Sequence, residues 1–303
     1  MSKFSVDTFK GPLLVRREFL CALLAGNYLG NQFIAEAMDN LKRHNKSSHF
    51  YWLDLRSGKI HLPAEHIIDT GQPGSLMKLI AATAIVQENL PSATKIIDCR
   101  GAIIVAGKHY ICRYPHGPLS LVEAIGQSCN VFFARTAREL NADCFLHYLD
   151  KFGLSCSIHL TRNKLPNSVE LILGLAEQYN FSAMQILQLV SLIAGRGTLL
   201  DITNEEKLTS DPGFNERTWN ILQSGMQIAC QRGTAKKLDP QNKLHLAVKT
   251  GTTIHGRTFQ SWLAGYFPYE SPRYSFCLRS KIGTSYDCAV PAARQYLFGR
   301  DWT

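Results

Sequence analysis

The chain has 303 residues, of which 45% are hydrophobic, and its 33 lysines and arginines outnumber 24 acidic residues, for a net charge of +9. This composition supports a large buried core, and no internal repeat or Pro/Ser-rich linker divides the sequence, so a disordered or repetitive chain is excluded. The positive charge suits an anionic polymer, but there is no run of Lys and Arg with interleaved aromatic residues. We therefore predict no nucleic-acid partner.

Residues 1–45 differ from the rest of the chain, and we expect them to be separate from a folded unit of residues 46–303. Arg16 and Arg17 precede a moderately apolar run that ends at Ile34, and Ala35-Glu36-Ala37 follows. This is the layout of a twin-arginine export signal with its cleavage site. Glycine and asparagine interrupt the run, which is too broken for a transmembrane helix of ~20 apolar residues. A surface amphipathic helix is the alternative interpretation, and the segment could associate with a membrane.

Ser75-Leu76-Met77-Lys78 is an S-x-x-K motif at the start of an apolar run that reaches Val86. Pro73 and Gly74 mark a loop before it, so we expect Ser75 in the first turn of a buried helix. The helix dipole favours an oxyanion there, and Lys78 lies on the same face within reach of the hydroxyl. A buried lysine has a lowered pKa and can be the base that activates a serine nucleophile. An N-capping serine with a solvated lysine is the structural alternative for this motif alone.

Three of the nine cysteines lie close in sequence to one histidine: the group is Cys99, Cys112, His116 and Cys129. A Cys99–Cys112 disulfide is the first expectation. A structural zinc site that uses Cys99, Cys112 and either His116 or Cys129 is the second, although the spacing matches no standard zinc finger. Unlinked buried thiols are the third. We assign His116 no catalytic role.

Ser128-Cys129-Asn130 is an S-x-N motif between two apolar runs with helical spacing. We expect it on a short connection between two helices, with Ser128 and Asn130 pointing into a cleft. Ser128 would relay a proton to a leaving amine, and Asn130 would hold a substrate amide and orient Lys78. Helix capping is the structural alternative for Ser128.

Lys249-Thr250-Gly251 lies in the first of two strand-like runs, 244–253 and 259–268, which predict an antiparallel pair. Lys249 supplies a fixed cation for a carboxylate, and Gly251 removes the side chain where a substrate backbone would lie along the strand.

Two further expectations concern this strand. The backbone N–H of Thr252 could join that of Ser75 as an oxyanion hole. Lys249, if it faces Lys78, would help to lower the pKa of that base. An edge-strand lysine that merely limits aggregation is the structural alternative for Lys249 alone.

The three motifs occur in the order found in penicillin-recognising serine acyl-transferases. Over about residues 48–298 the chain resembles the transpeptidase domain of class B penicillin-binding proteins, the D,D-transpeptidases of peptidoglycan synthesis. Segments 50–60, 227–235 and 289–293 resemble the opening hairpin of this family, its G-T-A segment and the start of its closing helix. The chain departs from the family at Val248, where glycine is usual, and at Ala183-Met184-Gln185, where Thr-Pro-Leu-Gln is usual.

We expect an α+β fold in which an antiparallel sheet is flanked by helices and carries an inserted all-helical subdomain, as in β-lactamases and transpeptidases. Strands at about 50–62 and 244–283 are expected to pair in one sheet, and the helical stretch of about 75–235 is inserted between them. One cleft would then separate two parts of a single body.

The resemblance implies an acyl-serine D,D-transpeptidase that acts on D-Ala-D-Ala stem peptides and is inhibited by β-lactams. The catalytic residues would be Ser75, Lys78, Ser128 and Asn130, and the substrate-binding residues Lys249, Thr250, Gly251 and Thr252. This chemistry needs no metal or organic cofactor. The substrate requires an extracytoplasmic location, in the periplasm or cell envelope, and wall-synthesis proteins are the expected partners.

Three alternatives stay open. A class A β-lactamase would need a Glu-x-x-Leu-Asn loop, and the closest string, Glu170-Leu171-Ile172-Leu173-Gly174, lacks the asparagine. Asn130 argues against the class D pattern, which has a hydrophobic residue there. A D,D-carboxypeptidase differs only in using water as the acceptor. A non-catalytic β-lactam sensor or a scaffold is the alternative from a different class of protein.

Overall fold

The computed structural model describes residues 47–63, 70–154, 168–176, 179–200, 207–208 and 212–302. The segment on which the export-signal prediction rests lies outside these residues. Among the residues described, no helix is both long enough and apolar enough to span a bilayer.

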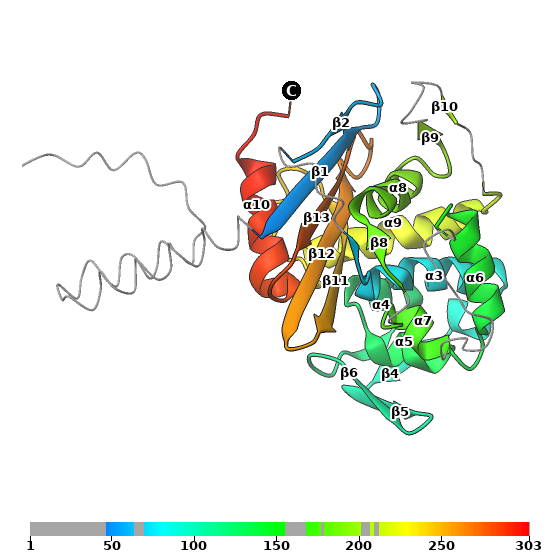
Figure 1. Ribbon diagram of the computed structural model, residues 1–303. Coiled ribbons are helices and arrows are strands. Elements are labelled where there is room, and N and C mark those ends of the chain that lie inside the picture. The colour runs from blue at the N-terminus through cyan, green and yellow to red at the C-terminus, as the bar shows by residue number, and fades with distance from the viewer. Residues whose placement is uncertain are drawn as a thin grey trace, which may run out of the picture. The chain divides into compact units, whose positions relative to one another are not determined.

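Strands from both ends of the described chain pair in one five-stranded antiparallel sheet (Figure 1). Its order is β11 (Ala247–His255), β12 (Thr258–Phe267), β13 (Tyr274–Ser280), β1 (Ser48–Asp54) and β2 (Ile60–His61). The longer strands are rich in β-branched and aromatic residues, which favour a pleated, buried surface. Gly256, with φ of +60°, lies in the tight turn between β11 and β12. The predicted pairing of the two ends is confirmed.

Alternate residues of the central strands point to opposite faces of the sheet, and both faces are buried. Val248, Leu263 and Phe276 pack in a core cluster with α10 (Val290–Phe298). On the other face, Trp262 and its neighbours pack in a second cluster with the helical region. In Figure 1, α10 accordingly lies on one side of the sheet and α8 on the other.

The region between β2 and β11 is mainly helical. Its helices are α3 (Met77–Gln87), α4 (Leu121–Gly126), α5 (Asn130–Thr136), α6 (Ala142–Lys151), α7 (Ser168–Leu173), α8 (Ala183–Ala194) and α9 (Glu216–Gln231).

The inserted region is not all-helical as predicted, because short antiparallel strand pairs interrupt it. They are β3 (Thr70–Gly71) with β8 (Phe181–Ser182), β4 (Ile97–Cys99) with β7 (Gly117–Leu119), β5 (Ala102–Val105) with β6 (Lys108–Ile111), and β9 (Leu199–Leu200) with β10 (Lys207–Leu208). Strands of two to four residues are too short to show an alternating pattern in the sequence. The β5–β6 hairpin projects from this region in Figure 1.

Helix α3 lies at the centre of the helical region, and residues 77–86 are all buried. A helix that is apolar on every side is typical of a protein core. Lys78 is the charged exception, with none of its surface exposed. A lysine in this position has a large desolvation cost, which marks it for a function other than stability.

Candidate active site

Ser75 lies in a short 3-10 turn, η2 (Gly74–Leu76), that leads directly into α3. Gly74 has φ of +54°, which a glycine adopts without strain. Gly74 and Leu76 are buried, whereas Ser75 is half-buried. The predicted serine at the start of a buried helix is therefore confirmed, with a 3-10 turn in place of the first α-helical turn.

Strand β11 passes directly beside this turn. A Cβ atom built on Gly74 would lie 2.9 Å from the carbonyl oxygen of Thr252 and 3.2 Å from its nitrogen. A Cβ atom on Gly251 would collide with the carbonyl oxygen of Pro73. Gly251 is thus needed for the packing of the strand against the serine-bearing turn, a reason that the sequence alone does not reveal.

The S-x-N motif lies in the short connection between α4 and α5, as predicted. Asn130 is the first residue of α5, and Cys129 is its N-cap. Ser128 has φ of +54°, a left-handed conformation that is uncommon for a residue with a side chain. Such strain is concentrated at functional sites, where the surrounding structure holds it in place.

Lys78 makes its hydrogen bonds with this motif. Its Nζ donates to the carbonyl oxygen of Ser128 at 2.7 Å and to Oδ1 of Asn130 at 2.6 Å, and lies 3.4 Å from Oγ of Ser128. Nδ2 of Asn130 donates to the carbonyl oxygen of Ile111 at 2.7 Å, which fixes the orientation of the amide. Burial disfavours the charged amine and lowers the pKa of Lys78 from 10.5 to about 8.

Lys249 is also fully buried. Its Nζ donates to Oγ of Ser128 and to the carbonyl oxygen of Thr250, both at 2.8 Å. Burial first, and the positive charge of Lys78 second, hold the pKa of Lys249 well below the usual lysine value. Lys78 and Lys249 are far apart in the sequence, yet both side chains contact Ser128.

Two residues that were not predicted as site residues form hydrogen bonds with threonine side chains of β11. Oγ1 of Thr250 donates to Oγ1 of Thr234 at 2.8 Å, and Oγ1 of Thr252 donates to Oγ of Ser285 at 3.0 Å. Thr234 belongs to the G-T-A segment, which could be identified from the sequence. Ser285 begins η5 (Ser285–Ala289). It could not be identified from the sequence, because its contact depends on how η5 packs on the strand.

Next to Ser285, the ring of Tyr286 contacts two cations. The guanidinium carbon of Arg113 is 4.1 Å from the ring centroid and Nζ of Lys237 is 4.3 Å from it. The hydrogen bond from Lys237 lowers the pKa of Tyr286. Arg113 follows β6 and Lys237 follows the G-T-A segment, so positive charge from two parts of the chain gathers beside β11.

The four residues singled out between the motifs come together as a cluster of three thiols and one imidazole, formed by Cys99, Cys112, His116 and Cys129. The expected Cys99–Cys112 disulfide is not formed: all three cysteines are free, and the two sulfurs lie 3.8 Å apart. Cys112 is equally close to Cys129, at 3.8 Å, so proximity in the sequence did not identify a unique pair. These residues could hold a metal ion.

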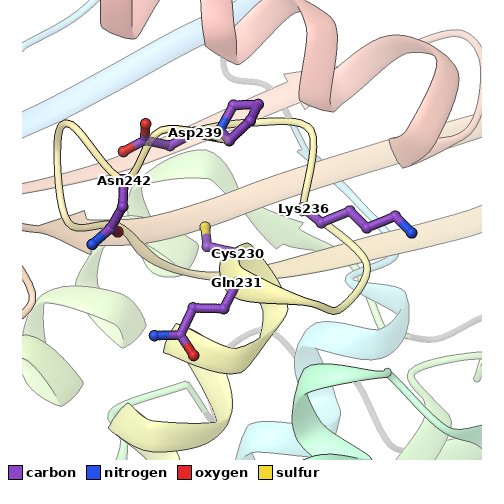
Figure 2. A pocket seen from close by; sticks show the side chains of 6 residues that line it. Cys230, Gln231, Lys236, Asp239 and Asn242 are labelled. Carbon is purple, nitrogen blue, oxygen red and sulfur yellow. The ribbon is translucent and has the colours of Figure 1, made fainter.

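A pocket of about 420 Å³ lies away from these motifs, where α9 leads into β11. Its lining includes Cys230, Lys236, Asp239 and Asn242 (Figure 2). The Asp239 carboxylate accepts hydrogen bonds from the backbone nitrogens of Lys243 and Leu244, at 2.9 and 2.8 Å. Asp239 therefore shapes the loop, and the pocket contains none of the predicted site residues.

A half-buried serine at a helix start, two buried lysines and a strained Ser-Cys-Asn loop thus lie on this α+β fold where the three motifs place them. The family model of the penicillin binding protein transpeptidase domain matches residues 36–294. The chain therefore belongs to that family.

Among curated proteins, the chain is similar to penicillin-binding protein PbpB of Mycolicibacterium smegmatis, with 24% identity over 250 residues. The matched region is 67% of this chain and 38% of the relative, so the chain spans well under half the length of that protein. A shorter match, 27% identical over 101 residues, is with PbpB of Mycobacterium tuberculosis and covers 33% of this chain and 15% of that protein.

Solved structures share the fold at lower identity. The TP domain of Burkholderia pseudomallei penicillin-binding protein 3 superposes with a TM-score of 0.70 and 16% identity, covering 98% of this chain and 96% of that one. PBP2 of Helicobacter pylori, in its complex with MreC, gives a TM-score of 0.69 and 18% identity over 85% of this chain and 62% of that one.

Proposed function

We propose that the protein is a serine D,D-transpeptidase that forms an acyl-enzyme on Ser75 with stem peptides ending in D-Ala-D-Ala. The observation that carries the proposal is Lys78, a fully buried amine three residues after the accessible serine, with a pKa lowered to about 8. An amine with that pKa can accept a proton near neutral pH, which an ordinary lysine cannot.

Acylation would proceed as follows. Ser75 Oγ attacks the penultimate D-Ala carbonyl carbon as its proton passes to Lys78. When the amide C–N bond breaks, the amine of the terminal D-Ala takes a proton through Ser128, whose backbone oxygen is 2.7 Å from Lys78 Nζ and whose hydroxyl contacts both lysines. An amine of a second stem peptide then attacks the ester carbonyl: the new amide C–N bond forms, the ester C–O bond breaks, and the proton lost by the amine returns to Ser75 Oγ through Lys78. Atoms and protons balance without a cofactor.

Substrate binding is assigned to β11. The terminal carboxylate would dock beside Lys249 with Thr250, where a fixed cation and a hydroxyl lie next to each other. The backbone N–H groups of Ser75 and Thr252 would stabilise the tetrahedral oxyanion, and the close approach of Gly74 to Thr252 supports this pairing.

The β-lactamase alternative is less well supported, because it needs a carboxylate that activates water. Glu170, the nearest match in the sequence, forms an ion pair with Lys108 of the β5–β6 hairpin. The carboxypeptidase alternative uses the same acyl-enzyme and differs only in the acceptor. A scaffold would not need two buried lysines at the cost of their desolvation. A β-lactam sensor would form the same acyl-enzyme and stop there, so it differs in giving no cross-linked product.

Two measurements test the proposal. Benzylpenicillin should add one acyl group per chain, seen by intact-protein mass spectrometry, and the adduct should persist for many minutes; Ser75→Ala should remain unlabelled. Sustained turnover at about 1 per second or faster would favour a β-lactamase. A stem pentapeptide incubated with an amine acceptor should then give a cross-linked product, whereas tetrapeptide alone would indicate a carboxypeptidase.

We further infer an extracytoplasmic location, because the proposed substrate is found there, and interaction with other wall-synthesis proteins. The similarity to H. pylori PBP2, whose structure was solved with MreC, supports a partner of that kind. Protease accessibility of the folded unit in intact cells, compared with lysed cells, tests the location.

A further inference from the structure

The cluster of Cys99, Cys112, His116 and Cys129 is not used in the chemistry described above. Its members come from four places in the fold: the end of β4, the residue after β6, the residue before β7, and the N-cap of α5. The three cysteines are buried and His116 is half-buried. All four ligand atoms nevertheless lie within 4.8 Å of one another.

The separations match a tetrahedral zinc site. Zinc–sulfur bonds of about 2.3 Å at tetrahedral angles place two sulfurs about 3.8 Å apart, and a sulfur and a nitrogen about 3.6 Å apart. Sγ of Cys112 lies 3.8 Å from Sγ of Cys99 and 3.8 Å from Sγ of Cys129. Sγ of Cys99 lies 3.3 Å from Nδ1 of His116. Three sulfurs and one imidazole nitrogen therefore lie close enough together to share one zinc ion.

Two of the sulfurs accept hydrogen bonds from backbone N–H groups. The backbone N–H of Asn130 donates to Sγ of Cys112 at 3.2 Å, and the backbone N–H of Phe132 donates to Sγ of Cys129 at 3.3 Å. Such donors stabilise ligands that carry negative charge. Three thiolates and one zinc ion carry a net charge of −1, and Asn130 connects this charge to buried Lys78. The charges on the two sides of Asn130 are therefore complementary.

We propose that Cys99, Cys112, His116 and Cys129 bind one structural zinc ion. Three sulfurs and one imidazole nitrogen form a closed ligand set, which leaves no position for substrate or a reactive water. Zinc is preferred over magnesium or calcium because the donors are soft and nitrogen-containing rather than oxygen.

The ion would anchor the base of the β5–β6 hairpin, since Cys99 precedes the hairpin and Cys112 directly follows it. It would also hold the S-x-N loop in place, because Cys129 is the middle residue of that motif. Asn130 is attached to this region by its backbone, which bonds Cys112, and by its side chain, which bonds Ile111. The four residues are thus positioning residues for Asn130, and this part of the inference rests on the proposed function.

The test is metal analysis of the 303-residue chain, purified without chelators and desalted after incubation with equimolar zinc. We expect about one zinc per chain by inductively coupled plasma mass spectrometry, retained through gel filtration. Cobalt in place of zinc should give the visible absorption of tetrahedral thiolate coordination. Ser75→Ala should bind zinc equally well, which separates failure of the zinc site from failure of the proposed function.

His116→Gln is the main variant, because His116 is only half-buried and its loss should not prevent folding. It should bind zinc at least about tenfold more weakly. His109→Gln, on exposed β6 of the hairpin, is the matched control and should retain the metal. Cys99→Ser tests a second ligand, and Cys144→Ser controls for loss of a cysteine outside the cluster.

Three results would overturn the proposal: folded wild-type protein that holds less than about a tenth of an equivalent of zinc, zinc bound equally by wild type and His116→Gln, or a disulfide at Cys112. The disulfide would be seen as the loss of two hydrogens in the mass of the peptides that contain it.

Discussion

Lys249 Nζ donates a 2.8 Å hydrogen bond to Ser128 Oγ, so a residue of the sheet and a residue of the helical region meet at one hydroxyl. The same serine offers its carbonyl oxygen to Lys78 at 2.7 Å. Lys78 also lies 3.4 Å from Oγ of Ser128, but the shortest hydrogen bond of each lysine goes to a different atom of Ser128. This difference underlies the separate roles of the two amines.

Exchange of each lysine for arginine should separate these roles. Arginine keeps its proton and cannot act as a base, so Lys78→Arg should slow acylation by benzylpenicillin about 10²–10⁴-fold. Lys249→Arg keeps a cation beside Thr250 and should cost less than about tenfold. Rapid-quench labelling followed by mass spectrometry gives both rates. Equal losses in the two variants would contradict the assignment.

The acylation rate should depend on pH through Lys78. Its pKa is lowered to about 8, so the neutral amine is the minor form at pH 6 and the major form at pH 9. The rate should therefore rise about tenfold per pH unit below pH 8 and level off above it. Stopped-flow measurements at constant ionic strength, with circular dichroism as a check on folding, provide the profile. A rate that is flat from pH 6 to pH 9 would rule out Lys78 as the base.

Ser128→Ala removes the hydroxyl that contacts both lysines and should lower the acylation rate about 10²-fold or more while leaving the fold intact. Ser120→Ala is the matched control. Ser120 caps α4 in a capping box with Glu123, so its loss should reduce the free energy of unfolding by about 1 kcal/mol and leave acylation unchanged. Urea unfolding and penicillin labelling of both variants are the measurements, and the opposite pattern would reverse the two roles.

Gly251→Ala should disturb the contact between β11 and the Ser75 turn, because the added methyl group meets the carbonyl oxygen of Pro73. We expect a loss of about 1–3 kcal/mol in the free energy of unfolding, together with slower acylation. Gly107→Ala has open space around it but a φ of +77°, so it should cost about 1 kcal/mol through backbone strain alone and leave acylation unchanged. A Gly251→Ala protein that acylates at the wild-type rate would show that the turn tolerates displacement.

The sequence predicted the sheet and the site motifs because both depend on local patterns. Two strand-like runs predicted β11 and β12, and the resemblance of residues 50–60 to an opening hairpin predicted β1. The order of the three motifs predicted which residues share a site, and the apolar run after Ser75 predicted the buried position of Lys78.

What the sequence could not predict depends on contacts between distant segments. Val248, which replaces the usual glycine before the K-T-G motif, pairs across the sheet with Gly265, where a Cβ atom would lie 2.7 Å from the Val248 side chain. The absence of a side chain at Gly265 therefore leaves room for the Val248 side chain. The left-handed backbone of Ser128 and the contact of Ser285 with Thr252 have no local signature either, because tertiary packing imposes them.

The burial of Lys78 and Lys249 also makes binding of an anion depend on protons. Two amines with depressed pKa values hold fewer protons at mildly alkaline pH than two surface lysines would. A carboxylate that docks beside Lys249 favours the charged form and raises both pKa values. Substrate binding should therefore take up protons from solution, most strongly near pH 8, and the heat of binding should vary with the ionisation enthalpy of the buffer. In this cleft the anionic substrate would restore the positive charge that burial suppresses.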